Sequence, residues 1–181
     1  AFGIKSSYVV LVRRTADPHD SKTGPVNAIV PEMHIPSHHG PDVQSVIPDL
    51  PITTAAVKVS TTLMHVHVVR AKLARPVERK DIVDLFENTT RLMLVSKSLG
   101  IKSTAELMEW ARELGRKRSD LYEIAIWEES INVDGDTVYF TQAVHQEADV
   151  VPENIDALRA VFGLADKEQS IRKTNRSLGI K

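Results

Sequence analysis

Short runs of β-branched and aromatic residues, spaced along the chain between turn residues, constrain its fold most strongly. Runs of this length and composition are typical of sheet strands. The Asp134-Gly135 dipeptide between two of them favours a tight hairpin turn and therefore antiparallel pairing. The predicted strands cover residues 8–12, 53–60, 66–74, 92–95, 121–127, 131–133 and 137–145.

Helical signals are fewer and stand between the predicted strands. Ser103 to Glu106 fits a capping box that opens a helix ending at Gly115, with Leu107 and Ala111 on its apolar stripe. Another helix is expected after Pro76. Few helices and a hairpin-containing set of strands predict an α+β fold, a mostly antiparallel mixed sheet with helices packed on one face.

Two further helices are predicted near the end of the chain. Pro152 is expected to open the first, which ends at Gly163. A last amphipathic helix is expected from about Asp166 to Ser177. The first of these is predicted to bury Ile155, Leu158, Val161 and Phe162.

Composition indicates one domain and excludes several classes of protein. The chain has 181 residues and 42% hydrophobic content, which suits a single core over 1–181. A net charge of -1 gives no overall basic field for nucleic acid or an anionic membrane. No apolar run is long enough to span a bilayer and no signal peptide is recognisable, so we expect a cytoplasmic protein. No glycine-rich strand-to-helix fingerprint occurs, so a complete dinucleotide-binding Rossmann domain is absent from this chain.

The chain contains no cysteine, which excludes a thiolate nucleophile of its own. It begins at Ala1 rather than methionine. Processing, a fragment and a partial chain of a longer protein all remain open as explanations.

Two histidines on one predicted strand are the leading candidates for chemistry. His65 and His67 are two residues apart, so both imidazoles should project from one face of the strand. Histidine is the usual general acid or base near neutral pH. Ordinary hydrogen-bonded histidines and a metal-binding pair are the alternatives.

A histidine-rich loop before a predicted short helix is the second candidate. His38, His39 and Gly40 precede Pro41, which can open a helix over 42–46 with Gly40 as its cap. Free N–H groups at a helix start favour an anion such as phosphate. A rigid turn without a ligand is the alternative reading.

Two arginines and a glutamine are further candidates. Arg13 and Arg14 end a predicted strand, project to opposite faces, and have guanidinium groups suited to phosphate or carboxylate. Taken alone, they are better explained by structural salt bridges. Gln146 follows another strand and could hydrogen-bond a ligand or cap a loop. The histidine spacings fit no familiar zinc motif, so no metal site is expected.

Several segments, taken in order, resemble archaeal glyceraldehyde-3-phosphate dehydrogenases. The match runs through essentially the whole chain, and a series of motifs in one order is far more specific than any single motif. The segments are Val12-Arg13-Arg14-Thr15-Ala16-Asp17-Pro18, Gly24-Pro25-Val26-Asn27, Pro36-Ser37-His38-His39-Gly40-Pro41-Asp42-Val43, Thr61-Thr62-Leu63-Met64-His65-Val66-His67, Ala143-Val144-His145-Gln146-Glu147, Val151-Pro152-Glu153-Asn154-Ile155-Asp156-Ala157 and Thr174-Asn175-Arg176-Ser177-Leu178-Gly179.

The resemblance implies the catalytic and oligomerisation domain of a phosphorylating enzyme. That reaction converts glyceraldehyde 3-phosphate, inorganic phosphate and NADP or NAD to 1,3-bisphosphoglycerate in glycolysis or gluconeogenesis. The family's reactive cysteine and Rossmann domain are expected upstream of Ala1, so this chain alone should be inactive. A homotetramer is also implied, with no nucleic-acid or membrane partner.

The resemblance also implies roles for particular residues. His65 matches the catalytic position that activates the thiol and hydrogen-bonds the developing oxyanion. His39 and Gly40 match substrate-contacting positions, and Arg13 is expected to serve phosphate or structure. Arg14 and Gln146 match positions near the cofactor. His38 and His67 are expected to support these residues.

One alternative from another class is a phosphate-binding or assembly module that keeps this fold without catalysis. A histidine-ligated metal hydrolase is a third possibility. The choice between NAD and NADP stays open, because the residues that select the nucleotide would lie in the absent domain.

Overall fold

The computed structural model describes residues 1–14 and 28–180. The motif segments 15–18 and 24–27 lie outside the described residues. Of the seven segments that carry the resemblance, five are therefore described in full.

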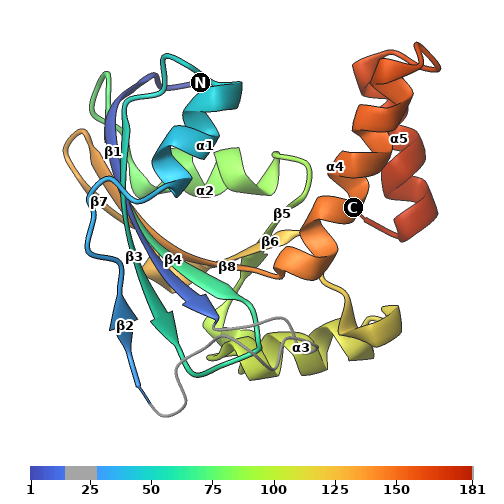
Figure 1. The fold of residues 1–181 in the computed structure, drawn as a ribbon, viewed down its shortest axis with the longest axis horizontal. Helices are drawn as coiled ribbons and strands as arrows, with labels where there is room; N and C mark the ends of the chain where they lie inside the picture. The colour runs from blue at the N-terminus through green and yellow to red at the C-terminus, as the bar shows by residue number, and fades with distance from the viewer. Residues whose placement is uncertain (15–27, 181) are drawn as a thin grey trace.

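One sheet of eight strands organises the described part of the chain (Figure 1). Its order is β2-β3-β1-β4-β8-β6-β5, and β7 also pairs with β8. Parallel pairing occurs between β1 and β3 and between β5 and β6, while the other pairs are antiparallel. The strands are β1 Ile4–Arg14, β2 Val30–Pro31, β3 Ile52–Val59, β4 His65–Leu73, β5 Leu92–Val95, β6 Ile124–Trp127, β7 Asn132–Asp134 and β8 Thr137–Val144.

Five α-helices accompany the sheet in the described residues, together with three short 3₁₀ turns. The predicted α+β fold with a mostly antiparallel mixed sheet is confirmed. None of the helices combines the length and apolar character that crossing a membrane requires, as far as the structure describes the chain. The helices are α1 His39–Val46, α2 Arg79–Glu87, α3 Thr104–Glu113, α4 Gln146–Val161 and α5 Lys167–Leu178.

The helices cover both faces of the sheet, which corrects the prediction that they pack on one face. Neighbouring residues of β6 point to opposite sides, and they belong to different cores. Ile126 packs with Ile82 of α2, while Ala125 packs with Leu107 and Ala111 of α3. In Figure 1, α1 and α2 lie above the sheet and α3 below it. Because both faces of this part of the sheet are apolar, each face must be buried by a different helix.

Most predicted strands agree with the structure to within a few residues, and the hairpin is confirmed. Asp134 pairs with Thr137 across a two-residue turn. Gly135 has a φ of 58°, which a glycine adopts without strain. The capped helix is also confirmed, because the Ser103 side chain accepts the Glu106 N–H at the start of α3.

The prediction for α4 is wrong at its start and in the face it buries. The helix begins at Gln146, six residues before Pro152, because the His145 carbonyl already accepts the N–H groups of Ala148 and Asp149. A proline within the helix removes a single backbone hydrogen bond.

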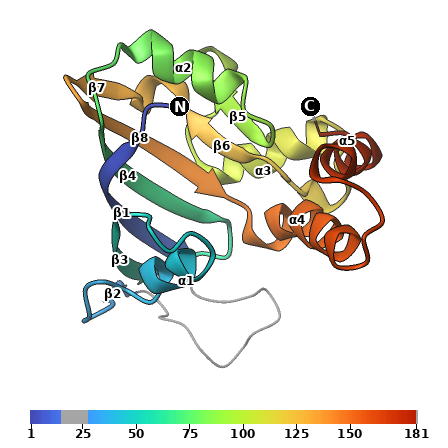
Figure 2. The same cartoon turned by 90° about the horizontal axis from the view of Figure 1, so that it is seen from above.

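Leu158, Val161 and Phe162 are 59%, 78% and 69% exposed rather than buried. The reason is that α4 packs mainly against α5. Figure 2 shows this helix pair beside the end of β8 rather than over the sheet.

Candidate functional site

His65 is buried and held at both ring nitrogens. The Arg14 backbone N–H donates to its Nδ1 at 3.1 Å, and its Nε2 lies 2.7 Å from the Gln146 side-chain oxygen. A backbone amide can only donate, so Nδ1 carries a lone pair and the neutral ring bears its proton on Nε2. Burial lowers the pKa of His65; the Gln146 hydrogen bond opposes this, and the Arg14 and Arg13 charges add to it. Three predicted site residues, His65, Arg14 and Gln146, therefore meet at one point.

His67 shares the face of His65, as the two-residue spacing predicted. The ring centroids are 6.5 Å apart and the rings are stacked. Gln142 donates to His67 Nδ1 at 3.2 Å, while the buried Nε2 has no hydrogen-bond partner among the described residues. Burial, with smaller contributions from His65 and His39, lowers the pKa of His67 to about 4. His67 is therefore neutral at physiological pH, and its N–H has no acceptor in the described part of the chain.

A cavity of about 570 Å³ lies on this face of the sheet, between the strands, α1 and α2. Most of its wall is apolar, and Phe86 and Phe140 are among its lining residues. His67 is one of four polar side chains along β3, β4, β8 and α1 that also line it; the others are His39, Thr54 and Gln142. Ala1 and Phe2 line the same cavity.

Gly40 is not the helix cap that the sequence predicted. α1 begins at His39, so Gly40 is its second residue and is buried. The Gly40 N–H donates to the Thr54 hydroxyl at 3.0 Å, and a Cβ at Gly40 would lie 3.1 Å from that oxygen. Glycine at this position therefore lets α1 approach β3 closely.

The predicted anion site at the start of α1 is largely blocked by hydrogen bonds within the protein. The Gly40 N–H is bonded to Thr54 and Ser37, and the Asp42 N–H is bonded to the His38 carbonyl. Pro41 has no N–H. An anion at this end of the molecule must therefore depend on side chains.

A chain of hydroxyl groups fixes the tautomer of His39. The Ser37 hydroxyl donates to Thr54 Oγ1 at 2.8 Å, and Thr54 Oγ1 donates to the Ser37 carbonyl at 3.1 Å. The Ser37 oxygen must then accept from His39 Nδ1, which lies 3.1 Å away, so His39 Nε2 carries a lone pair. Burial and then the Arg13 charge lower the pKa of His39. A neutral His39 thus offers an acceptor rather than a positive charge.

The two arginines contact different surroundings, as their alternation in a strand predicted. Arg14 forms a salt bridge with Glu147 of α4, with nitrogen and oxygen 3.0 Å apart. Arg13 lines a second pocket, of about 300 Å³, together with Glu32, His38 and Lys58. The Arg13 Nε is buried and has no hydrogen-bond partner among the described residues. Arg13 and Lys58 are the two cationic side chains that line this pocket.

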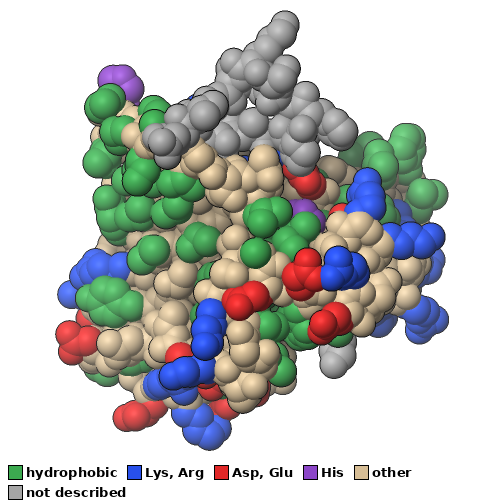
Figure 3. Space-filling view, turned by 90° about the horizontal axis from the view of Figure 1, so that it is seen from below, with side chains coloured by type: hydrophobic (Ala, Val, Ile, Leu, Met, Phe, Trp, Pro, Cys, Tyr) green, Lys and Arg blue, Asp and Glu red, His purple; other side chains and the backbone are tan. Residues whose placement is uncertain are grey.

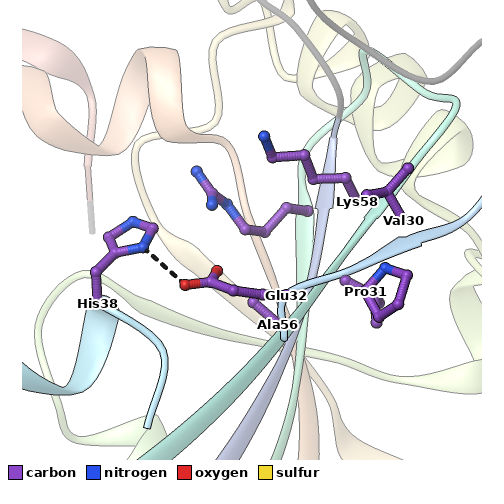
Figure 4. Close-up of a pocket in the computed structure, with 8 residues that line it drawn as sticks. Val30, Pro31, Glu32, His38, Ala56 and Lys58 are labelled. Atoms are coloured by element: carbon purple, nitrogen blue, oxygen red, sulfur yellow. Dashed lines mark hydrogen bonds and ion pairs between the residues drawn. The ribbon is translucent and has the colours of Figure 1, made fainter. Parts of the chain in front are cut away.

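Sequence reasoning missed several residues of these two pockets. Glu32 lies on the segment after β2 and accepts from His38 Nδ1 at 3.3 Å (Figure 4). One potential ligand atom each of Glu32, His38 and His39 lies within 4.8 Å of the other two, so these residues could hold a metal. Lys58 and Thr54 were also not singled out from the sequence, although both side chains lie on the face of β3 that borders these pockets. No sequence signal marks Glu32, which is brought in only by the pairing of β2 with β3.

The charges on the surface are mixed. Figure 3 shows Lys and Arg side chains interspersed with Asp and Glu on the face turned toward the viewer. This agrees with the near-zero net charge and leaves no single-sign field on that face.

Comparison with known proteins assigns the chain to a family. A family model described as "Glyceraldehyde 3-phosphate dehydrogenase, C-terminal domain" matches residues 1–130. The chain belongs to this family. A glyceraldehyde-3-phosphate dehydrogenase from Pyrococcus abyssi is 60% identical over 173 residues, which are 96% of this chain and 52% of the relative. The enzyme of that name from Methanopyrus kandleri is 57% identical over 181 residues, 99% of this chain and 52% of the relative.

The chain spans about half the length of the curated relatives it matches. The resemblance seen in the sequence is thereby confirmed, and the non-catalytic module is not favoured as an alternative. The family-model match ends within the η3 turn, Glu128–Ser130, while the relatives match through β8, α4 and α5 as well.

Proposed function

We propose that the protein to which this chain belongs is a phosphorylating glyceraldehyde-3-phosphate dehydrogenase. It would convert glyceraldehyde 3-phosphate, phosphate and NAD or NADP to 1,3-bisphosphoglycerate. The observation that carries the proposal is a buried His65, fixed at both ring nitrogens, in contact with Arg14 and Gln146. The family assignment supports the same reaction class.

His65 is the proposed catalytic residue, and its tautomer indicates how it acts. Its Nε2–H, which donates to the Gln146 oxygen in this structure, would turn to the aldehyde oxygen as negative charge develops there during attack by a thiolate. The Arg14 N–H on Nδ1 disfavours a second proton on the ring, so the geometry supports hydrogen-bond donation better than proton abstraction in the resting state. Taking the thiol proton would require Arg14 to release Nδ1.

Gln146 and Arg14 are the proposed cofactor contacts. A nicotinamide, when bound, supplies the hydride acceptor. The residues present fit such a group: Gln146 contacts His65 through its oxygen, which leaves an amide nitrogen able to donate to a carboxamide. Arg14 adds a fixed positive charge, anchored by Glu147, beside the same histidine.

Arg13, His39 and Gly40 are the proposed substrate and phosphate contacts. Arg13 would donate to a phosphate through its guanidinium group, which lines the smaller pocket and whose Nε lacks a partner among the described residues. His39 would accept a hydrogen bond from a substrate hydroxyl through its Nε2 lone pair. Gly40 contributes by allowing α1 to lie against Thr54, which sets the position of His39.

The nucleophile would be a cysteine upstream of Ala1, as the resemblance implies. The cavity lined by His67 also reaches Ala1 and Phe2, so the first described residues lie on the same face of the sheet as His67. The domain assignment, with a catalytic domain over 1–181 and a separate Rossmann domain, is part of the same proposal.

We also propose a cytoplasmic homotetramer. Large apolar side chains are exposed along residues 29–47, which suits a surface covered by another subunit. Light scattering of the full-length protein should give the mass of four subunits; a monomer would contradict this part. The exposed members are Ile29, Val30, Met33, Ile35, Val43, Val46 and Ile47.

A reduction assay tests the proposed activity. Full-length protein should reduce NAD or NADP only when both glyceraldehyde 3-phosphate and phosphate are present. The 181-residue chain should show no turnover, because it has no thiol to form the covalent acyl intermediate. Turnover by the cysteine-free chain, or none by the full-length protein, would overturn the proposal.

A further inference from the structure

We propose that Glu32, His38 and His39 form a binding site for a divalent transition metal ion of the Zn²⁺ class. The proposal goes beyond the dehydrogenase function and does not depend on it. One potential ligand atom of each residue already lies within 4.8 Å of the other two. Two imidazoles and a carboxylate are a common three-ligand set for zinc, with a fourth position left to water.

The hydrogen bonds of His39 fix a tautomer that suits a metal ligand. Its Nδ1–H is donated to Ser37, whose side chain is buried and itself held by Thr54. A metal-binding histidine typically donates its other ring N–H to a fixed acceptor in this way, which keeps the ring in place and its lone pair toward the ion. His39 Nε2 is therefore available without any change of tautomer.

His38 and Glu32 would complete the set by side-chain rotation, and His38 would bind the ion through a ring nitrogen that carries no proton. Their side chains are 55% and 27% exposed, and Glu32 Oε1 already lies 3.3 Å from His38 Nδ1. Figure 4 shows the imidazole and the carboxylate pointing toward one another. Zn–N and Zn–O bonds of about 2.0–2.2 Å require the ligand atoms to lie somewhat closer together than in the present group. The His38 and His39 ring centroids lie 3.9 Å apart, so the two imidazoles are already neighbours.

The chemistry of the group selects the ion. Imidazole nitrogens suit Zn²⁺, Co²⁺, Ni²⁺ and Cu²⁺, whereas Mg²⁺ and Ca²⁺ prefer oxygen ligands. Arg13 and Lys58 line the same pocket and repel any cation, so the single carboxylate of Glu32 is essential to offset them. We therefore expect moderate affinity for Zn²⁺ and none for Mg²⁺.

Because His39 is also a proposed substrate contact, a bound ion and the substrate would compete for one lone pair. Zn²⁺ would then inhibit the dehydrogenase, and chelation would restore it. Metal binding is measured independently of activity, so a failure of the dehydrogenase proposal and a failure of this one are distinguishable.

Titration of the 181-residue chain with Co²⁺ tests the site, because four-coordinate Co²⁺ absorbs visible light far more strongly than six-coordinate Co²⁺. The variants Glu32→Gln and His38→Asn each remove one ligand, and each should weaken binding by at least about 10-fold. His34→Asn is the matched control, since His34 is exposed in the same segment and outside the group. Added Zn²⁺ should displace the cobalt.

The outcomes decide the proposal. A strong cobalt spectrum that is kept in the control and lost in both ligand variants supports the site. A spectrum that persists in Glu32→Gln and His38→Asn places the ion elsewhere and overturns it. Absence of any strong spectrum in the unmodified protein overturns it as well, and circular dichroism of each variant shows that the fold is retained.

Discussion

Two clusters of buried polar side chains differ in how completely their groups are satisfied. Around Arg91, at the start of β5, all three kinds of guanidinium nitrogen have an acceptor: Nε donates to Asn175 at 3.0 Å and Nη1 to Glu153 at 2.6 Å, while Nη2 contacts Asp156. Around His65, by contrast, His67 Nε2 and Arg13 Nε are buried without partners among the described residues.

The difference separates a structural network from a binding site. Asp156 also accepts from Ser170 and Thr174, at 2.5 Å and 2.7 Å. The Arg91 cluster therefore joins the start of β5 to α4 and α5, and each of its described side chains takes part in a hydrogen bond. An unpartnered buried donor costs free energy in the unbound protein. The His65 region contains such unpartnered donors, which is expected where a ligand or another segment of the protein supplies the missing acceptors.

Removing His65 should have the largest effect of any change in either cluster. In full-length protein, His65→Ala should lower kcat by about 10²–10⁴, or about 3–5 kcal/mol of activation free energy, with the fold retained. Steady-state kinetics and thermal unfolding measure the two effects. The control is Asp156→Ala, assayed at a temperature where it is folded, which should keep near-normal kcat. A His65 variant with normal kcat would remove this residue from the mechanism.

Breaking the Arg91 network should have the next largest effect, on stability rather than catalysis. Asp156→Ala leaves Arg91, whose side chain is 10% exposed, without its main anion. Loss of one partner from a buried pair costs about 3–5 kcal/mol. Denaturant unfolding of the 181-residue chain should show this loss, whereas Glu153→Gln should cost under about 1 kcal/mol, because the Glu153 side chain is 66% exposed. Equal losses in both variants would refute the distinction.

The sequence predicted local structure and the main catalytic candidate well, because both depend on short-range patterns. The Asp134-Gly135 turn and the Ser103 cap each follow from a few neighbouring residues. His65 and His67 share a face because a strand alternates every two residues. These features need no knowledge of which elements meet.

What the sequence could not predict depends on contacts between distant segments. Gln146 reaches His65 across 81 positions, and Glu32 reaches His38 only after β2 joins the edge of the sheet. The exposure of Leu158 and Phe162 was also missed, because an apolar stripe shows that a helix face needs cover but not what covers it. Pro152 misled the prediction of α4, since proline marks the first turn of a helix only on average.

The unpartnered His67 should make the folded chain less stable as the pH falls. Its pKa of about 4 lies below the unfolded value of about 6.5, so the unfolded state binds the proton first and stability is lost between those values. We expect a loss of about 2–3 kcal/mol from this residue, read from unfolding curves between pH 7 and pH 4. His67→Asn should flatten the slope. An unchanged slope would show that other groups, including His39 and His65, control it.

Asp149 in the first turn of α4 tests whether an unpartnered buried atom by itself marks a functional site. Its Oδ1 is buried without a partner among the described residues, as is His67 Nε2, yet Asp149 lines neither of the two pockets described above. Burial raises the pKa of Asp149 to about 6. Protonated Asp149 contributes its full stability below the unfolded pKa of about 3.9, and this contribution is lost as the pH rises through about 6. The pH dependence of stability from Asp149 is thus opposite in sign to that from His67.

Asp149→Asn should therefore stabilise the chain above pH 6, by about 1 kcal/mol once screening by solvent is allowed for, and should have no such effect at pH 4. Denaturant unfolding at both pH values measures this. In the full-length protein the same variant should turn over substrate at the normal rate, because this carboxyl lies outside both pockets. If turnover instead slowed by about 10-fold or more without loss of fold, the functional site would extend into α4. The contrast between buried atoms that serve catalysis and those that only limit stability would then be lost.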